Sequence, residues 1–212
     1  MFSIIVTLCK LIARLFNKNA SRQTEPARPA PVAAARPSRA AVVALMDRLE
    51  QLGFYRYVPA GQVAACKSKD VNASSPFTSE SSRVYLADAE DLAEGGVQGF
   101  LMELRPFLHR LGVKITAVSQ QFDAERDYVV SVNGTSHLIY SAQQAESWES
   151  WEQASRQAFT IVNRLLEQAG SAERLYRLYG GNDCQAVLLT PEMYAVIKES
   201  GLVDQGEMPE SV

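Results

Sequence analysis

The chain of 212 residues is poor in the side chains that most often carry catalysis or bind metals. It contains two histidines and three cysteines, and neither an HExxH nor a CxxC spacing occurs. Zinc sites need several such ligands at helical or turn spacing. Cys9, Cys66 and Cys184 are odd in number and far apart, which indicates a reducing compartment rather than a disulfide framework. We therefore predict no metal, no cofactor and no catalytic residue.

The sequence is also short of the roughly 20 consecutive apolar residues that span a bilayer. Its most apolar stretch, residues 2–16, is interrupted by Lys10. In a cleaved signal peptide the basic residues come before the apolar run, whereas here they lie within it and after it. Secretion, or a periplasmic location after signal cleavage, is therefore the lesser alternative for this segment.

Residues 1–18 instead have the pattern of an amphipathic helix. At 100° per residue a narrow basic stripe runs along one side and apolar side chains fill most of the rest. Such a helix lies in the plane of an anionic membrane surface, and this is the interpretation we favour. A short spanning anchor with Lys10 reaching the headgroups, or a helix docked on a partner, are the alternatives. The predicted membrane-associating residues are Phe2, Ile5, Leu8, Lys10, Ile12, Arg14, Leu15, Phe16 and Lys18.

Charge is distributed unevenly along the chain. Residues 1–39 hold seven of the 21 basic residues and a single acid, Glu25, which gives this arm +6 and leaves −9 on the remainder. Cations after the apolar run place the body at the cytoplasmic face of the inner membrane. A body of this charge does not suit nucleic acid, which binds proteins that displace phosphate counterions. An anionic membrane surface for the arm and a protein partner for the body are the expected partners.

Composition divides the chain into four parts. The helix of residues 1–18 is followed by a proline-, alanine- and arginine-rich linker over 19–38, a globular domain over 39–202 and a polar tail over 203–212 that we expect to be disordered.

Periodicity and turn signals predict the elements of the globular domain. Apolar stripes predict helices over 39–52, 99–111, 143–169 and 191–200, the first capped by Ser38 and the last by Thr190. Strands flank an Asn133-Gly134 turn and a Gly-Gly-Asn-Asp turn at 180–183. Residues 54–58 and 83–87 read as short strands, 113–122 as a longer one, and 59–82 as a long loop. These elements predict an α+β fold with an antiparallel sheet of about five strands, covered by helices on one face.

Two segments are candidates for binding a partner. Asp88 would cap a short acidic helix, and the paired glycines of the 180–183 turn expose backbone amides. Both features also have ordinary structural explanations, as a solvated face and as hairpin geometry. The candidate residues are Asp88, Glu90, Asp91, Glu94, Gly180, Gly181, Asn182 and Asp183.

The leading functional hypothesis is a non-enzymatic, membrane-associated protein whose acidic body masks a partner, as an immunity-type inhibitor or adaptor does. One alternative is an enzyme with a carboxylate-based site near Asp123–Asp127, or at Glu146 and Glu149. Ser136 and His137 are adjacent in a strand and point to opposite faces, so they do not form a nucleophile–base pair. A second alternative is a structural scaffold in a membrane assembly.

Overall fold

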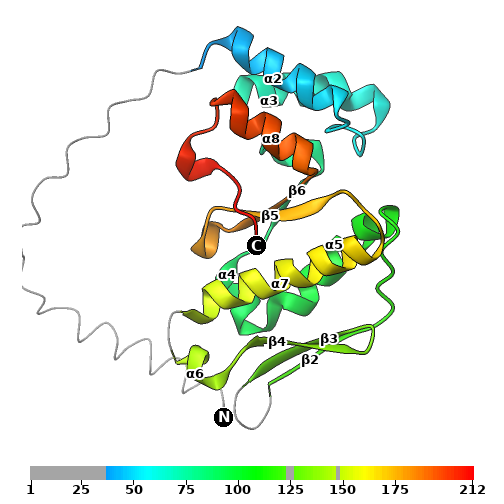
Figure 1. The fold of residues 1–212 in the computed structure, drawn as a ribbon, viewed down its shortest axis with the longest axis vertical. Helices are drawn as coiled ribbons and strands as arrows, with labels where there is room; N and C mark the ends of the chain where they lie inside the picture. The colour runs from blue at the N-terminus through cyan, green and yellow to red at the C-terminus, as the bar shows by residue number, and fades with distance from the viewer. Residues whose placement is uncertain (1–36, 123–126, 147–148) are drawn as a thin grey trace, which may run out of the picture. The chain divides into compact units, whose positions relative to one another are not determined.

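The computed structural model describes residues 37–212 except 123–126 and 147–148 (Figure 1). The predicted membrane-associating helix and most of the predicted linker lie outside the described residues, as do Asp123 and Glu125. Within the part that is described, none of the helices combines the length and apolar content needed to cross a bilayer.

Helices and strands alternate irregularly along the described chain. In order they are α2 (Arg39–Gln51), α3 (Val63–Ala73), β1 (Val84–Leu86), α4 (Ala89–Asp91), a π-helical turn (Leu92–Gly96), α5 (Val97–Arg110), β2 (Val118–Phe122), β3 (Tyr128–Val132), β4 (Thr135–Tyr140), α6 (Ala142–Ala145), α7 (Glu149–Gln168), β5 (Arg174–Leu178), β6 (Gln185–Leu189) and α8 (Pro191–Ser200). Short 3₁₀ turns occupy Ala60–Gln62, Ser79–Ser81, Gly181–Asp183 and Gln205–Glu207.

The fold is α+β, as predicted, but the described strands form two sheets rather than one of about five strands. Sheet A has the order β1-β6-β5 and sheet B the order β2-β3-β4, and every pairing is antiparallel. The two hairpins were correctly predicted, with Asn133 and Gly134 both at positive φ in their turn. Turn signals show which strands are neighbours along the chain, but they do not show which hairpins share a sheet.

Strands β5 and β6 of sheet A are buried on both faces, whereas the sequence predicted helices on one face of the sheet. Successive residues of β6 belong alternately to two hydrophobic cores: Ala186 and Leu188 face α5 and α7, while Val187 and Leu189 face α2, α3 and α8. Sheet B packs against the other side of α5 and α7, so the layers are helix, sheet, helix, sheet (Figure 1). A strand buried on both faces reads as a continuous apolar run, as 186–189 does.

The segment 54–82 differs most from its prediction. Residues 54–58 form turns instead of a strand, and the expected loop over 59–82 contains helix α3. The buried side of α3 consists of Cys66, Asp70 and Val71, and the Tyr55 hydroxyl donates a 2.7 Å hydrogen bond to Asp70 Oδ2. Because a carboxylate occupies the buried stripe, the apolar periodicity that would reveal this helix is interrupted.

Arg83, directly before β1, is the centre of a buried polar cluster. Its side chain is 0% exposed and that of its partner Glu173 is 3% exposed. Two N–H groups donate to the Glu173 carboxylate, at 2.9 and 3.2 Å, and carbonyls of Gly53, Phe54 and Leu188 accept the other hydrogen bonds. This cluster ties β1 and β6 to the turn after α2.

The C-terminal residues do not form the frayed tail that was expected. Glu210 pairs with Arg177 through two backbone hydrogen bonds of 2.8 and 2.6 Å, and its carboxylate accepts from the Arg177 guanidinium. A second carboxylate, Glu152 on α7, accepts from Arg177 Nη1 at 2.6 Å. The tail therefore covers the outer edge of β5, one of the two edges of sheet A.

Candidate functional site

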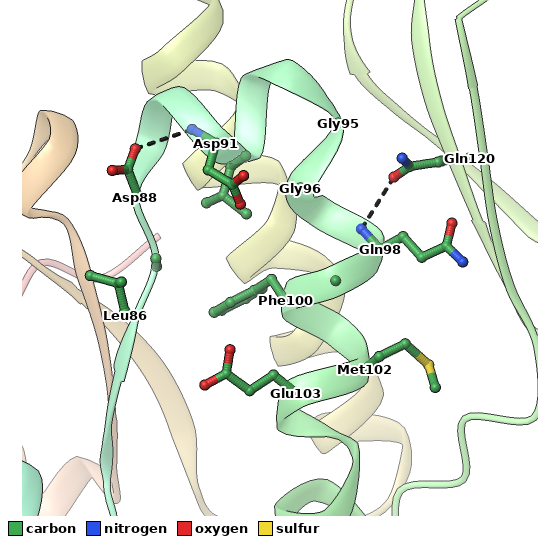
Figure 2. Close-up of a pocket in the computed structure, with 13 residues that line it drawn as sticks. Leu86, Asp88, Asp91, Gly95, Gly96, Gln98, Phe100, Met102, Glu103 and Gln120 are labelled. Carbon is green, nitrogen blue, oxygen red and sulfur yellow. Dashed lines mark hydrogen bonds between the residues drawn. The ribbon is translucent and has the colours of Figure 1, made fainter.

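The candidate site is a groove of about 790 Å³ between the end of β1 and helix α5 (Figure 2). We call it the β1–α5 groove. From α5, Phe100 and Glu103 point toward β1, whereas Gln98 and Met102 point toward β2. It is lined by Leu86, Ala87, Asp88, Asp91, Leu92, Gly95, Gly96, Gln98, Gly99, Phe100, Met102, Glu103 and Gln120.

The upper end of the groove is shaped by a capped turn and two glycines. Asp88 Oδ1 accepts hydrogen bonds from the backbone of Glu90 (2.9 Å) and Asp91 (3.1 Å), so the predicted cap is confirmed. Gly95 has φ +109°, and a Cβ on Gly96 would lie 2.1 Å from Asp91 Oδ2. Gly95 has non-helical φ/ψ, so the chain kinks at the glycine pair, and the acidic helix that begins at Ala89 and helix α5 are separate helices that meet there. Asp91 lies over Gly96.

The groove is negatively charged. Asp88, Asp91 and Glu103 contribute carboxylates, and none of the described lining residues is lysine, arginine or histidine. Carboxylates around a concave surface concentrate their field there and attract cations. On β1, burial raises the pKa of Tyr85 to about 12, while Arg110 lowers and Glu103 raises it to a smaller extent.

The floor and rim are apolar. Phe100 is stacked on Phe159 of α7 with ring centroids 5.7 Å apart, so the floor is part of the main core. Leu86 is 64% exposed and Met102 is 41% exposed, and both line the groove. Large exposed apolar patches with a polar rim mark binding surfaces, and these two side chains add exposed apolar area to the groove.

One wall of the groove is an unpaired strand edge. The Arg83 carbonyl accepts from Leu188 N at 3.0 Å, and Ala87 N donates to the Cys184 carbonyl at 2.9 Å. Backbone groups alternate between the two sides of a strand, so those of Val84 and Leu86 point away from β6. Among the described residues, no group forms a hydrogen bond with them on that side.

The structure brings the two predicted partner-binding segments together. Asn182 Nδ2 in the 180–183 turn donates a 3.2 Å hydrogen bond to Glu90 Oε2. Asp88 and Asp91 line the β1–α5 groove, and Gly180, Gly181, Asn182 and Asp183 are exposed beside Glu90. The carboxylate at this position opposes the binding of an anion by the turn. Glu94 lies elsewhere, near Tyr140, whose pKa is raised by burial and, to a lesser extent, by Glu94.

Of the residues considered for an enzyme, the structure describes Asp127, Glu146, Glu149, Ser136 and His137. Asp127 Oδ1 accepts a 2.7 Å hydrogen bond from Ala142 N at the start of α6, and Glu146 and Glu149 are exposed. Ser136 Oγ pairs with Ser131 Oγ at 2.9 Å across the hairpin. Burial and, secondarily, Arg164 lower the pKa of His137. The described residues contain no group of three or more histidine, cysteine, aspartate or glutamate side chains placed to hold a metal ion.

Sequence reasoning missed most of the groove. Leu86 was placed in a strand, but nothing in a three-residue strand shows that one edge is left open. Phe100, Met102 and Glu103 were all placed on one helix, and only the position of that helix between β1 and β2 makes them line one groove, with Phe100 and Glu103 directed toward β1 and Met102 toward β2.

Comparison with protein-family models, curated proteins and solved structures gives no match to this chain.

Proposed function

We propose that this chain is a non-enzymatic, membrane-associated protein that binds a basic protein partner through the β1–α5 groove. The observation that carries the proposal is the charge of the groove: Asp88, Asp91 and Glu103 line it without a basic side chain among the described lining residues. An immunity-type inhibitor or an adaptor, whose acidic surface masks a cationic surface of its target, is the form of function that this suits best.

Two further features support a protein as the ligand. The charge of −9 outside the arm extends the negative field well beyond the groove, which accelerates encounter with a cationic protein. Leu86 and Met102 add exposed apolar area beside the carboxylates. A partly apolar patch with a charged rim is the usual anatomy of a protein interface.

A pair of charge-reversed variants tests the proposal. Full-length protein carrying D91K and E103K is compared with wild type and with a control carrying E192K and E199K, two exposed acids on α8. Both variants change the net charge equally. After chemical cross-linking in native membranes, we expect a stoichiometric partner with wild type and the control, and its loss with D91K/E103K. Equal capture by all three proteins, or turnover of a small molecule by the purified chain, contradicts the proposal.

The arm is proposed to supply the membrane attachment, at the cytoplasmic face of the inner membrane. Deletion of residues 2–18 should move the protein from the membrane to the soluble fraction, because the described body has no helix suited to spanning a bilayer. Replacing Lys10, Arg14 and Lys18 with Glu should weaken an in-plane helix by roughly 1 kcal/mol per cation or more. Retention of the deletion variant in membranes contradicts an anchoring role for the arm.

A further inference from the structure

We propose that the partner binds by strand addition: an extended segment pairs with the open edge of β1 and lies in the β1–α5 groove. This inference rests on the proposed function and specifies how the partner is recognised. The segment carries basic side chains on the face toward α5 and apolar side chains on the face that holds Leu86.

The backbone of sheet A favours this mode because its two edges differ. The edge of β5 is covered by the C-terminal residues, through the paired backbone groups of Arg177 and Glu210. The edge of β1 borders the groove, with the N–H and C=O groups of Val84 and Leu86 directed outward. Natural sheets usually cover or charge their edges, and an uncovered edge is a ready template for a peptide strand.

The side chains on either side of the edge specify the segment. Tyr85 packs on the core next to α5, so Val84 and Leu86 occupy the opposite face of the sheet. An apolar side chain on the added strand would pack beside exposed Leu86 on that face. The alternate residues of the added strand face α5, where the carboxylates of Asp91 and Glu103 can pair with basic side chains. Alternating basic and β-branched residues therefore complement this groove.

Charge also argues against a second copy of the chain as the occupant. A second β1 would bring Val84–Leu86 followed by Asp88, Glu90 and Asp91, and would add carboxylates to a groove that already holds three. Like charges placed together across an interface are unfavourable. A partner segment of opposite charge relieves this repulsion.

The test uses a displayed library of random seven-residue peptides, selected against the full-length protein. We expect the selected peptides to alternate lysine or arginine with valine, isoleucine or another apolar residue. Their affinity should fall at least tenfold on D91K/E103K and less than twofold on the E192K/E199K control. Binding should also slow hydrogen exchange at the Leu86 amide at least tenfold, because that N–H gains an acceptor.

Backbone methylation separates strand addition from simple charge attraction. Each peptide is resynthesised with N-methyl groups on alternate residues in one register or the other. Strand addition predicts at least tenfold weaker binding in one register and little change in the other. If peptide affinity depends on the Asp91 and Glu103 carboxylates but not on methylation, strand addition is refuted and the proposed function is unaffected. A selection that yields no peptides, or peptide affinities that D91K/E103K leaves unchanged, contradicts both strand addition and the proposed function. A concentration-dependent dimer in light scattering shows instead that a second copy of the chain occupies the groove.

Discussion

Replacing Glu173 with glutamine should destabilise the protein by about 3–5 kcal/mol, the usual cost of leaving one member of a buried ion pair unpaired. In the native protein the guanidinium of Arg83 donates to both Glu173 oxygens and to three backbone carbonyls, with no solvent exposure. Glutamine keeps the shape but turns an NH₂ group toward these donors. The Tyr57 hydroxyl, 3.0 Å from Glu173 Oε1, loses its charged acceptor as well.

Urea unfolding followed by circular dichroism measures this change. The matched control is Glu50→Gln, since Glu50 pairs with Lys67 at the surface and its side chain is 44% exposed. Exposed pairs contribute about 0–1 kcal/mol, so the control should unfold near the wild-type midpoint. If Glu173→Gln lowers the free energy of unfolding by less than about 1 kcal/mol, the Arg83–Glu173 pair is solvated or dispensable, which refutes its assigned role as a buried ion pair. The double variant Arg83→Met/Glu173→Met should lose less free energy of unfolding than the sum of the losses of Arg83→Met and Glu173→Met, because no charge remains buried in it.

Three further predictions follow from local geometry. Gly96→Ala should lower the free energy of unfolding by about 1–3 kcal/mol, since its Cβ would meet Asp91. Gly99→Ala has open space around its Cβ and should be neutral or stabilising by up to about 1 kcal/mol in thermal unfolding. Burial raises the pKa of the Cys184 thiol from 9.0 to about 11. The stabilisation that comes from keeping this thiol protonated is therefore complete below pH 9 and is lost as the pH rises through 11. Cys184→Ala should remove this part of the alkaline decline in the urea midpoint. The hydrogen bond from Arg177 lowers the pKa of Glu152, so the stabilisation from the ionised Glu152 carboxylate is present above pH 4.5 and is lost as the pH falls below that value. Glu152→Gln should therefore show a shallower loss of stability in acid. An unchanged acid profile would contradict the ion pair.

Local signals in the sequence predicted much of the fold. Ser38 and Thr190 cap α2 and α8 as expected, each accepting a backbone hydrogen bond from its own helix. The predicted helix over 99–111 is present as α5, which starts two residues earlier and passes through Pro106 as one helix. These predictions succeeded because caps, turns and apolar stripes depend on residues close together in the chain.

The predictions failed where distant residues decide the structure. Helix α3 was hidden because Asp70 on its buried side finds its partner in Tyr55, which the sequence does not place nearby. The ordered tail depends on Arg177 and Glu210, 33 residues apart. The candidate site follows the same division: Asp88 and Asp91 could be proposed from a local cap, whereas Glu103 joins them only through the packing of α5 beside β1.

The most direct test of the central claim is site-specific photo-cross-linking of the full-length protein in its native membrane. A photoreactive phenylalanine analogue is placed at Leu86, in the groove, or at Leu138, which is 50% exposed on β4 in sheet B. The two sites are similarly exposed and apolar, so unspecific contacts should label them equally. We predict a single cross-linked protein from position 86, weakened by high salt, and none from position 138. Equal labelling at both positions, or a product from 138 alone, would contradict binding through the β1–α5 groove.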